Sequence, residues 1–93
     1  MYQVYSITTP DNKYRYYGTT SNVAKRMYKH QYRLRGGYGG YCYLYQKLRE
    51  SVDSIYECKI KVVDTFGSKK IALRMEQQMI EKNGNLNSRN AVA

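Results

Sequence analysis

The chain has 93 residues, of which 42% are hydrophobic, and this predicts one domain over residues 1–93 with a small core. The net charge is +9 and unevenly spread: residues 12–49 hold nine Lys or Arg and no Asp or Glu, whereas residues 50–93 hold seven basic and six acidic residues. This asymmetry indicates a polyanionic partner, with nucleic acid ahead of an acidic membrane surface. A merely solubilising surface is the alternative, although such surfaces usually mix both signs.

Cysteine content and hydropathy argue against a structural zinc protein and against a membrane protein. Cys42 and Cys58 are isolated, and one histidine is too few for a structural zinc cluster, so we expect two free thiols in a reducing compartment. No apolar run approaches the roughly 20 residues of a membrane span, and no signal-like stretch follows Met1. We therefore expect a cytoplasmic protein that does not enter a membrane.

The first third of the chain predicts a hairpin and a helix. Alternating tyrosines and β-branched residues favour strands over 2–7 and 14–18, joined by a Pro-Asp-Asn turn. A helix follows, ending at the glycines 36–37, with three candidate N-caps: Thr20, Ser21 and Asn22. One face of this helix is apolar, and its boundary carries His30. A second face is polar and consists of Asn22, Arg26, Lys29 and Arg33.

The rest of the chain completes an α/β, more strictly α+β, pattern. Residues 36–40 read as a glycine-rich loop without the Lys-Ser/Thr of a phosphate-binding loop, and 41–50 as a helix whose tyrosines would also suit a strand. A third strand is expected over 54–66 and a helix over 67–84, before a polar tail. The order ββααβα predicts a small, mostly antiparallel three-stranded sheet flanked by helices.

The last predicted helix contains an unusual carboxylate. At helical spacing Glu76 lies at the centre of an apolar stripe made of Ala72, Leu73, Met79 and Ile80. Burying an ionised carboxylate without a partner costs several kcal/mol. Either an arginine forms a buried salt bridge with Glu76, or Glu76 has a functional role.

Five further polar residues have unusual placements, and each also has an ordinary interpretation. Tyr5 and Tyr16 could be sheet tyrosines, and Arg26 a solvated cation. His30 could lie at the edge of the core, and Asn87 could be a turn residue. Their combination is a more specific signal than any one of them. They occur in a fixed order along the predicted elements: QVY at 3–5, YYG at 16–18, Thr19 or Thr20, Arg26, His30, Glu76, Leu86 and Asn87.

In this order and on these elements the residues resemble the motifs of the GIY-YIG nucleases. Gln3, Val4 and Tyr5 stand where that family has Gly-Ile-Tyr on its first strand. Tyr16 and Gly18 match the outer residues of the family's second motif, Tyr-Ile-Gly. Gln3 in place of glycine and Tyr17 in place of isoleucine are departures, although neither replaces a chemical group of the family.

The resemblance implies a DNA endonuclease that depends on a divalent metal, one Mg²⁺ or Mn²⁺ held by Glu76. Hydrolysis of a phosphodiester requires that water lose a proton and that charge on the phosphate and the leaving oxygen be stabilised. Arg26 would bind the scissile phosphate, and Tyr5 would activate the water directly or through a relay shared with His30. Tyr16 would orient water or phosphate, and Asn87 would tie the tail to the site. The products would carry a 5′-phosphate and a 3′-hydroxyl.

Four cations near Arg26 are expected to bind flanking phosphates of the DNA: Lys25, Lys29, Arg33 and Arg35. No base-reading module is evident, so specificity would depend on DNA shape, on a homodimer (for example through residues 38–45) or on a targeting partner protein. An origin in a phage, virus or mobile element fits such a minimal nuclease. The alternative functions are a non-catalytic DNA-binding module of the same fold and a basic RNA-binding protein.

Overall fold

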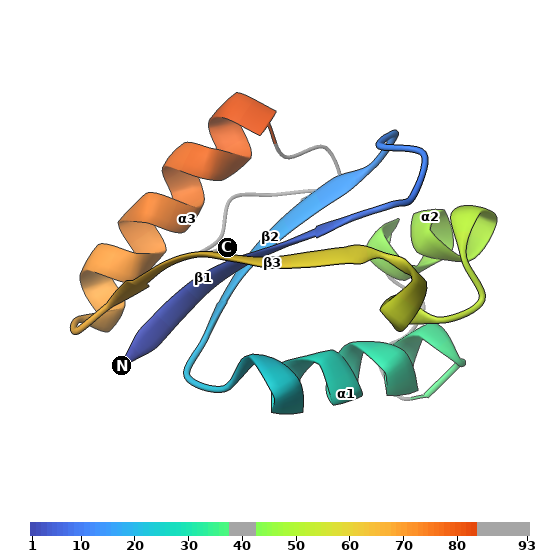
Figure 1. Ribbon diagram of the computed structural model, residues 1–93, viewed down its shortest axis with the longest axis horizontal. Helices are drawn as coiled ribbons and strands as arrows, with labels where there is room; N and C mark the ends of the chain where they lie inside the picture. The colour runs from blue at the N-terminus through green and yellow to red at the C-terminus, as the bar shows by residue number, and fades with distance from the viewer. Residues whose placement is uncertain (38–42, 84–93) are drawn as a thin grey trace.

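The computed structural model describes residues 1–37 and 43–83 of the chain. Its sheet has three antiparallel strands in the order β2-β1-β3, so β1 is central and β2 and β3 are edges (Figure 1). The strands are β1 (Tyr2–Thr8), β2 (Arg15–Thr20) and β3 (Lys59–Phe66). The helices are α1 (Val23–Leu34), α2 (Tyr43–Ser51) and α3 (Lys69–Asn83), with a short 3₁₀ turn, η1 (Ile55–Glu57). The expected α+β architecture and element order are confirmed.

The helices cover opposite faces of the sheet. Figure 1 shows the sheet nearly edge-on, with α3 on one side and α1 and α2 on the other. Tyr5 and Ile7 of β1 belong to a buried cluster with residues of α1, α2 and η1. Ala72 and Glu76 are the buried residues of α3, on the opposite face. The central strand is therefore covered on both faces, which explains its almost continuous burial.

The register of β1 and β2 decides which side chains share a face. Tyr5 pairs with Gly18 and Ile7 pairs with Tyr16, so these residues point toward α1. The intervening pairs, Val4 with Thr19 and Ser6 with Tyr17, point toward α3. Adjacent residues of β2 thus point in turn toward α1 and toward α3, on opposite faces of the sheet.

The predicted hairpin and first helix form as expected, with small shifts in their bounds. Asn12, in the Pro-Asp-Asn turn, adopts a positive φ of 62°, a conformation that asparagine tolerates better than most residues. The second strand begins one residue later than expected and continues to Thr20. Among the three candidate caps, Asn22 caps α1, because its side chain accepts a hydrogen bond from the Lys25 amide at 3.1 Å.

The expected third strand over 54–66 is wrong at its start, since β3 begins only at Lys59. Ser54 and Glu57 form a capping box instead: the Glu57 carboxylate accepts the Ser54 amide at 2.7 Å, and the Ser54 hydroxyl accepts the Tyr56 amide at 3.2 Å. This local pairing makes a 3₁₀ turn before the chain enters the sheet.

Several expectations concern residues whose structure is not described. Residues 38–42 contain most of the predicted glycine-rich loop and Cys42, and residues 84–93 contain Leu86 and Asn87. Cys58 is a buried free thiol, and burial, followed by the charge of Glu57, raises its pKa to about 11. No helix in the described ranges has the length and apolar character needed to cross a bilayer.

Candidate active site

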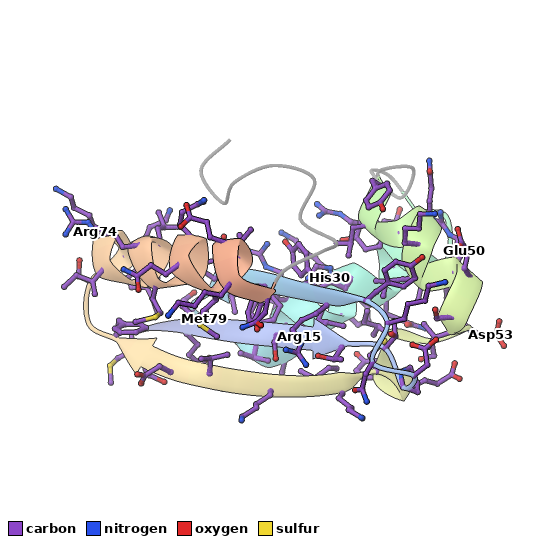
Figure 2. All side chains as sticks on the ribbon, turned by 90° about the horizontal axis from the view of Figure 1, so that it is seen from above. Arg15, His30, Glu50, Asp53, Arg74 and Met79 are labelled. Atoms are coloured by element: carbon purple, nitrogen blue, oxygen red, sulfur yellow. The ribbon has the colours of Figure 1, made fainter. Side chains whose placement is uncertain are left out.

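A buried pair formed by Tyr5 and His30 lies between the sheet and α1. Figure 2 looks down onto α3, so that His30 lies beyond the sheet from the viewer. The Tyr5 hydroxyl and His30 Nε2 are 2.8 Å apart, a hydrogen-bond distance. Tyr5 is 0% exposed and His30 2% exposed. Two residues predicted from distant motifs are therefore in direct contact.

Two more tyrosines complete this cluster. The Tyr16 ring lies edge-on to His30, with centroids 5.7 Å apart, and is tilted against Tyr5 at 6.4 Å. On the far side of the imidazole, the Tyr45 hydroxyl of α2 lies 2.7 Å from His30 Nδ1. Both ring nitrogens of His30 thus have a phenolic hydroxyl as partner. The ordinary interpretation of His30 as a residue at the edge of the core does not hold, because its side chain is 2% exposed and its ring contacts three tyrosines, Tyr5, Tyr16 and Tyr45.

Burial governs the ionisation of this cluster. It lowers the pKa of His30 to about 4, with smaller contributions from the positive charges of Arg26 and Arg33. Burial also raises the pKa of Tyr5 above its ordinary value of 10, and Tyr16 adds to the effect while Arg26 opposes it. At neutral pH His30 is therefore a neutral imidazole and Tyr5 a neutral phenol, and one proton can be shared between the Tyr5 oxygen and His30 Nε2.

Gly18 is required for this arrangement. It lies opposite Tyr5 in the neighbouring strand, and a Cβ atom at Gly18 would overlap the Tyr5 ring and hydroxyl. The aromatic ring covers the bare backbone of the glycine, which any side chain would prevent. The final glycine of the second sequence motif thus has a packing role that fixes the position of the phenol.

Glu76 lies on the other face of the sheet. Its carboxylate is 5% exposed, and Oε1 accepts a hydrogen bond from the Thr19 hydroxyl at 2.5 Å. Burial raises the pKa of Glu76, while the Thr19 hydroxyl and the charge of Arg26 oppose this rise. No donor within the described part of the chain contacts Oε2.

The salt bridge considered for Glu76 is not formed among the residues that the structure describes. Their one ion pair joins Lys47 to Glu50 on the surface, at 3.3 Å. Arg26 is half-buried on α1, and its charge affects the pKa of Tyr5, His30 and Glu76 alike. Arg26 therefore lies within electrostatic reach of the groups on both faces of the sheet.

A pocket of about 170 Å³ opens beside Arg26 at the start of α1. Its lining consists of Thr20, Ser21, Asn22, Lys25, Arg26 and Lys29. Lys25 and Lys29 thus lie beside Arg26 in this pocket. Arg33 and Arg35 do not line this pocket, since Arg35 lies nine residues beyond Arg26, about 13 Å along the helix axis.

The donor set suits a hard divalent cation better than zinc or another soft metal. In the described residues no three His, Cys, Asp or Glu side chains converge. Glu76 offers a carboxylate oxygen, and Thr19 offers a neighbouring hydroxyl. Mg²⁺ and Mn²⁺ accept oxygen ligands, and Mg²⁺ retains several of its waters, so one carboxylate and water fit such an ion.

Two features near the site could not be predicted from the sequence: the contact made by Tyr45 and a second groove lined by cations. No sequence pattern marks Tyr45, because its contact with His30 depends on how α1 and α2 pack. A groove of about 370 Å³ between α3 and the sheet also contains three cations, Arg15, Lys59 and Lys61 (Arg15 and Met79 are labelled in Figure 2). Two of them already donate hydrogen bonds within the fold, Arg15 to Thr8 and Lys59 to Asn12.

The fold and this combination of residues define the class of protein. Tyrosines and a histidine lie on one side of a small sheet, an arginine lies on the helix α1, and a helical glutamate lies on the other side. Such groups suit phosphodiester chemistry. The family model of the GIY-YIG catalytic domain matches residues 1–90, and the chain therefore belongs to the GIY-YIG family, a family of endonucleases. Neither the curated proteins nor the solved structures include a match to the chain.

Proposed function

We propose that this chain is a DNA endonuclease that uses one divalent cation, Mg²⁺ or Mn²⁺, bound at Glu76. The observation that carries the proposal is the environment of Glu76: a buried carboxylate without an ion pair among the described residues, with one oxygen lacking a donor there. Burial raises the pKa of this carboxyl, and a cation bound to it would favour the charged form. A module that only binds nucleic acid has no evident need for such a group.

Arg26 binds the scissile phosphate in this proposal. Its guanidinium is permanently charged and can donate two parallel hydrogen bonds to phosphate oxygens. The pocket beside it, with Lys25 and Lys29, provides further positive charge for the adjoining backbone. Arg33 and Arg35 bind more distant phosphates of the DNA. Asn87 ties the tail to the site or contacts the substrate.

Tyr5 and His30 carry the proton away from the attacking water. Tyr5 is fully enclosed in this structure, so the water must reach its oxygen as the substrate binds. The water then gives a proton to the Tyr5 oxygen while the Tyr5 proton passes to His30 Nε2, 2.8 Å away. The resulting hydroxide attacks phosphorus, and the bond from phosphorus to the 3′ oxygen breaks. That oxygen takes a proton from solvent and His30 returns its proton to solvent through Tyr5, so the products are a 5′-phosphate and a 3′-hydroxyl. Tyr16, which packs on both rings, orients the water.

Concerted transfer is needed because Tyr5 does not ionise by itself. Its pKa lies above the ordinary value of 10, so a free phenolate is too scarce at neutral pH to act as the base. Neutral His30, whose pKa is about 4, can receive the proton without first losing one. A cation bound at Glu76 would stabilise negative charge on the phosphate and on the leaving oxygen.

The test is nicking of supercoiled plasmid DNA with Mg²⁺, with EDTA and with Glu76→Gln. We expect EDTA and Glu76→Gln each to lower the nicking rate at least about 100-fold while DNA binding is retained. Glu81→Gln is the matched control, because Glu81 is an exposed glutamate on the same helix and should tolerate the same change.

The outcomes separate the two candidate functions. Full activity of Glu76→Gln, or nicking in EDTA, would contradict a metal site at Glu76. If the wild-type protein binds plasmid tightly without cutting it, a branched DNA junction is the next substrate. Failure to cut both would favour the non-catalytic binding module.

A further inference from the structure

The two hydrogen bonds of His30 restrict where its proton can lie. Tyr5 contacts Nε2 at 2.8 Å, and Tyr45 contacts Nδ1 at 2.7 Å. A neutral imidazole has one N–H donor and one acceptor nitrogen. One tyrosine therefore donates to the ring and the other accepts from it, and the two arrangements correspond to the two tautomers of His30.

The surroundings of Tyr5 distinguish between the tautomers. Tyr5 is fully buried, and among the described residues its hydroxyl has no hydrogen-bond partner besides His30 Nε2. If Nε2 carried the proton, the Tyr5 hydroxyl would accept from it and its own O–H would be left without an acceptor in the core. A buried donor without a partner is costly, whereas unused lone pairs on an oxygen are tolerated more easily.

We infer that His30 is held as the tautomer protonated at Nδ1, and that Tyr45 is the positioning residue that selects this tautomer by accepting the Nδ1–H. In this arrangement the Tyr5 hydroxyl donates to the unprotonated Nε2. The tautomer follows from hydrogen-bond satisfaction alone. Its importance for catalysis rests on the proposed function, because only an unprotonated Nε2 can receive the proton of Tyr5.

Tyr45 is well suited to this role. It is 2% exposed and lies on α2, so its position depends on an element that supplies no other residue to the proposed chemistry. Its ring centroid is 5.8 Å from that of His30, and the hydrogen bond between hydroxyl and Nδ1 is buried. Replacement by phenylalanine would keep the ring and remove the hydroxyl that accepts the Nδ1–H. The Nδ1–H would then be unsatisfied, and the proton would move to Nε2, where the Tyr5 oxygen can accept it.

The decisive measurement is the tautomer of His30 by long-range ¹H–¹⁵N correlation spectroscopy at neutral pH. His30 is the only histidine of the chain, so its ring signals need no further assignment. We expect the Nδ1–H form in the wild-type protein and a shift toward the Nε2–H form in Tyr45→Phe. Plasmid nicking by Tyr45→Phe should fall roughly tenfold or more with DNA affinity unchanged. A merely structural role would not change the tautomer.

The control is Tyr43→Phe, which removes the same hydroxyl from an exposed tyrosine of α2 and should change neither the tautomer nor the nicking rate. An Nε2–H form in the wild-type protein, or an unchanged Nδ1–H form in Tyr45→Phe, would overturn the inference. If the tautomer shifts as expected while the wild-type protein cuts no DNA, the role of Tyr45 stands and the proposed function fails.

Discussion

Acidification should destabilise the fold through His30. The ring is buried, and burial, followed by the charges of Arg26 and Arg33, lowers its pKa from 6.5 to about 4. Because the folded pKa lies below the unfolded value, the fold prefers the neutral ring. This contribution to stability is fully present above pH 6.5 and is lost as the pH falls from 6.5 to about 4.

The size of the effect follows from the two pKa values. The gap between 6.5 and about 4 corresponds to about 3 kcal/mol of unfolding free energy. Small domains have a total stability of about 5–15 kcal/mol, so this loss would be easy to measure. Protonation would also require both Tyr5 and Tyr45 to accept hydrogen bonds from the ring, which leaves the Tyr5 O–H without its acceptor.

Glu76 acts in the opposite direction. Its folded pKa is raised by burial, so protonation of this carboxylate as the pH falls favours the folded state. The measurement is therefore made in the Glu76→Gln protein without metal, by urea unfolding at a series of pH values from 7.5 to about 4. His30→Gln in the same background is the control, because glutamine keeps a donor and an acceptor but does not titrate.

The two proteins should differ in how their unfolding free energy depends on pH. We expect the unfolding free energy of the Glu76→Gln protein to fall steeply below pH 6.5, and that of the protein also carrying His30→Gln to fall much less. Parallel pH curves for the two proteins would show that His30 does not cause the loss. An NMR titration of His30 with a midpoint near its ordinary pKa would refute the reasoning at its first step.

Three further predictions concern the sheet edge and the DNA contacts. Gly18→Ala should lower the unfolding free energy by about 1–3 kcal/mol in thermal denaturation, because its Cβ would overlap the Tyr5 ring, and unchanged stability would contradict this packing. Arg26→Lys should lower the single-turnover nicking rate at least about tenfold, since lysine cannot form the bidentate phosphate contact, and wild-type nicking would exclude that contact. Lys25→Ala and Lys29→Ala should each reduce the log–log salt dependence of duplex binding by about 0.9, measured by fluorescence anisotropy, and an unchanged slope would remove that residue from the interface.

The sequence predicted the parts of the fold that depend on local patterns. The hairpin and the helices follow from alternation, helical spacing and caps, all within short windows. The start of β3 was wrong because Ser54 and Glu57 compete with the sheet through a capping box, which the alternating pattern after residue 54 obscures. The sequence does not single out Asn22 as the cap, since three neighbouring residues have suitable side chains.

The site was predictable only in part. Glu76 stood out because a charge interrupts an apolar stripe, and its burial is confirmed. Tyr45 could not be recognised, since it is one of 12 tyrosines and its role depends on the packing of α2 against α1. The use of Thr19 rather than Thr20 as the partner of Glu76 also required the strand register, because adjacent residues of a strand point to opposite faces.

The edge strand β2 connects the two halves of the site. Gly18 lets the Tyr5 ring lie against the backbone on one face, and Thr19 holds Glu76 on the other. Because these residues are consecutive, the phenol and the carboxylate are fixed relative to each other by one peptide unit, and a register slip of one residue would displace both. Arg26 influences both groups across this edge without an ion pair to Glu76 in the described structure. Arg26 and Glu76 thus form no ion pair with each other in the described structure, and an anionic phosphate together with a divalent cation would pair with both.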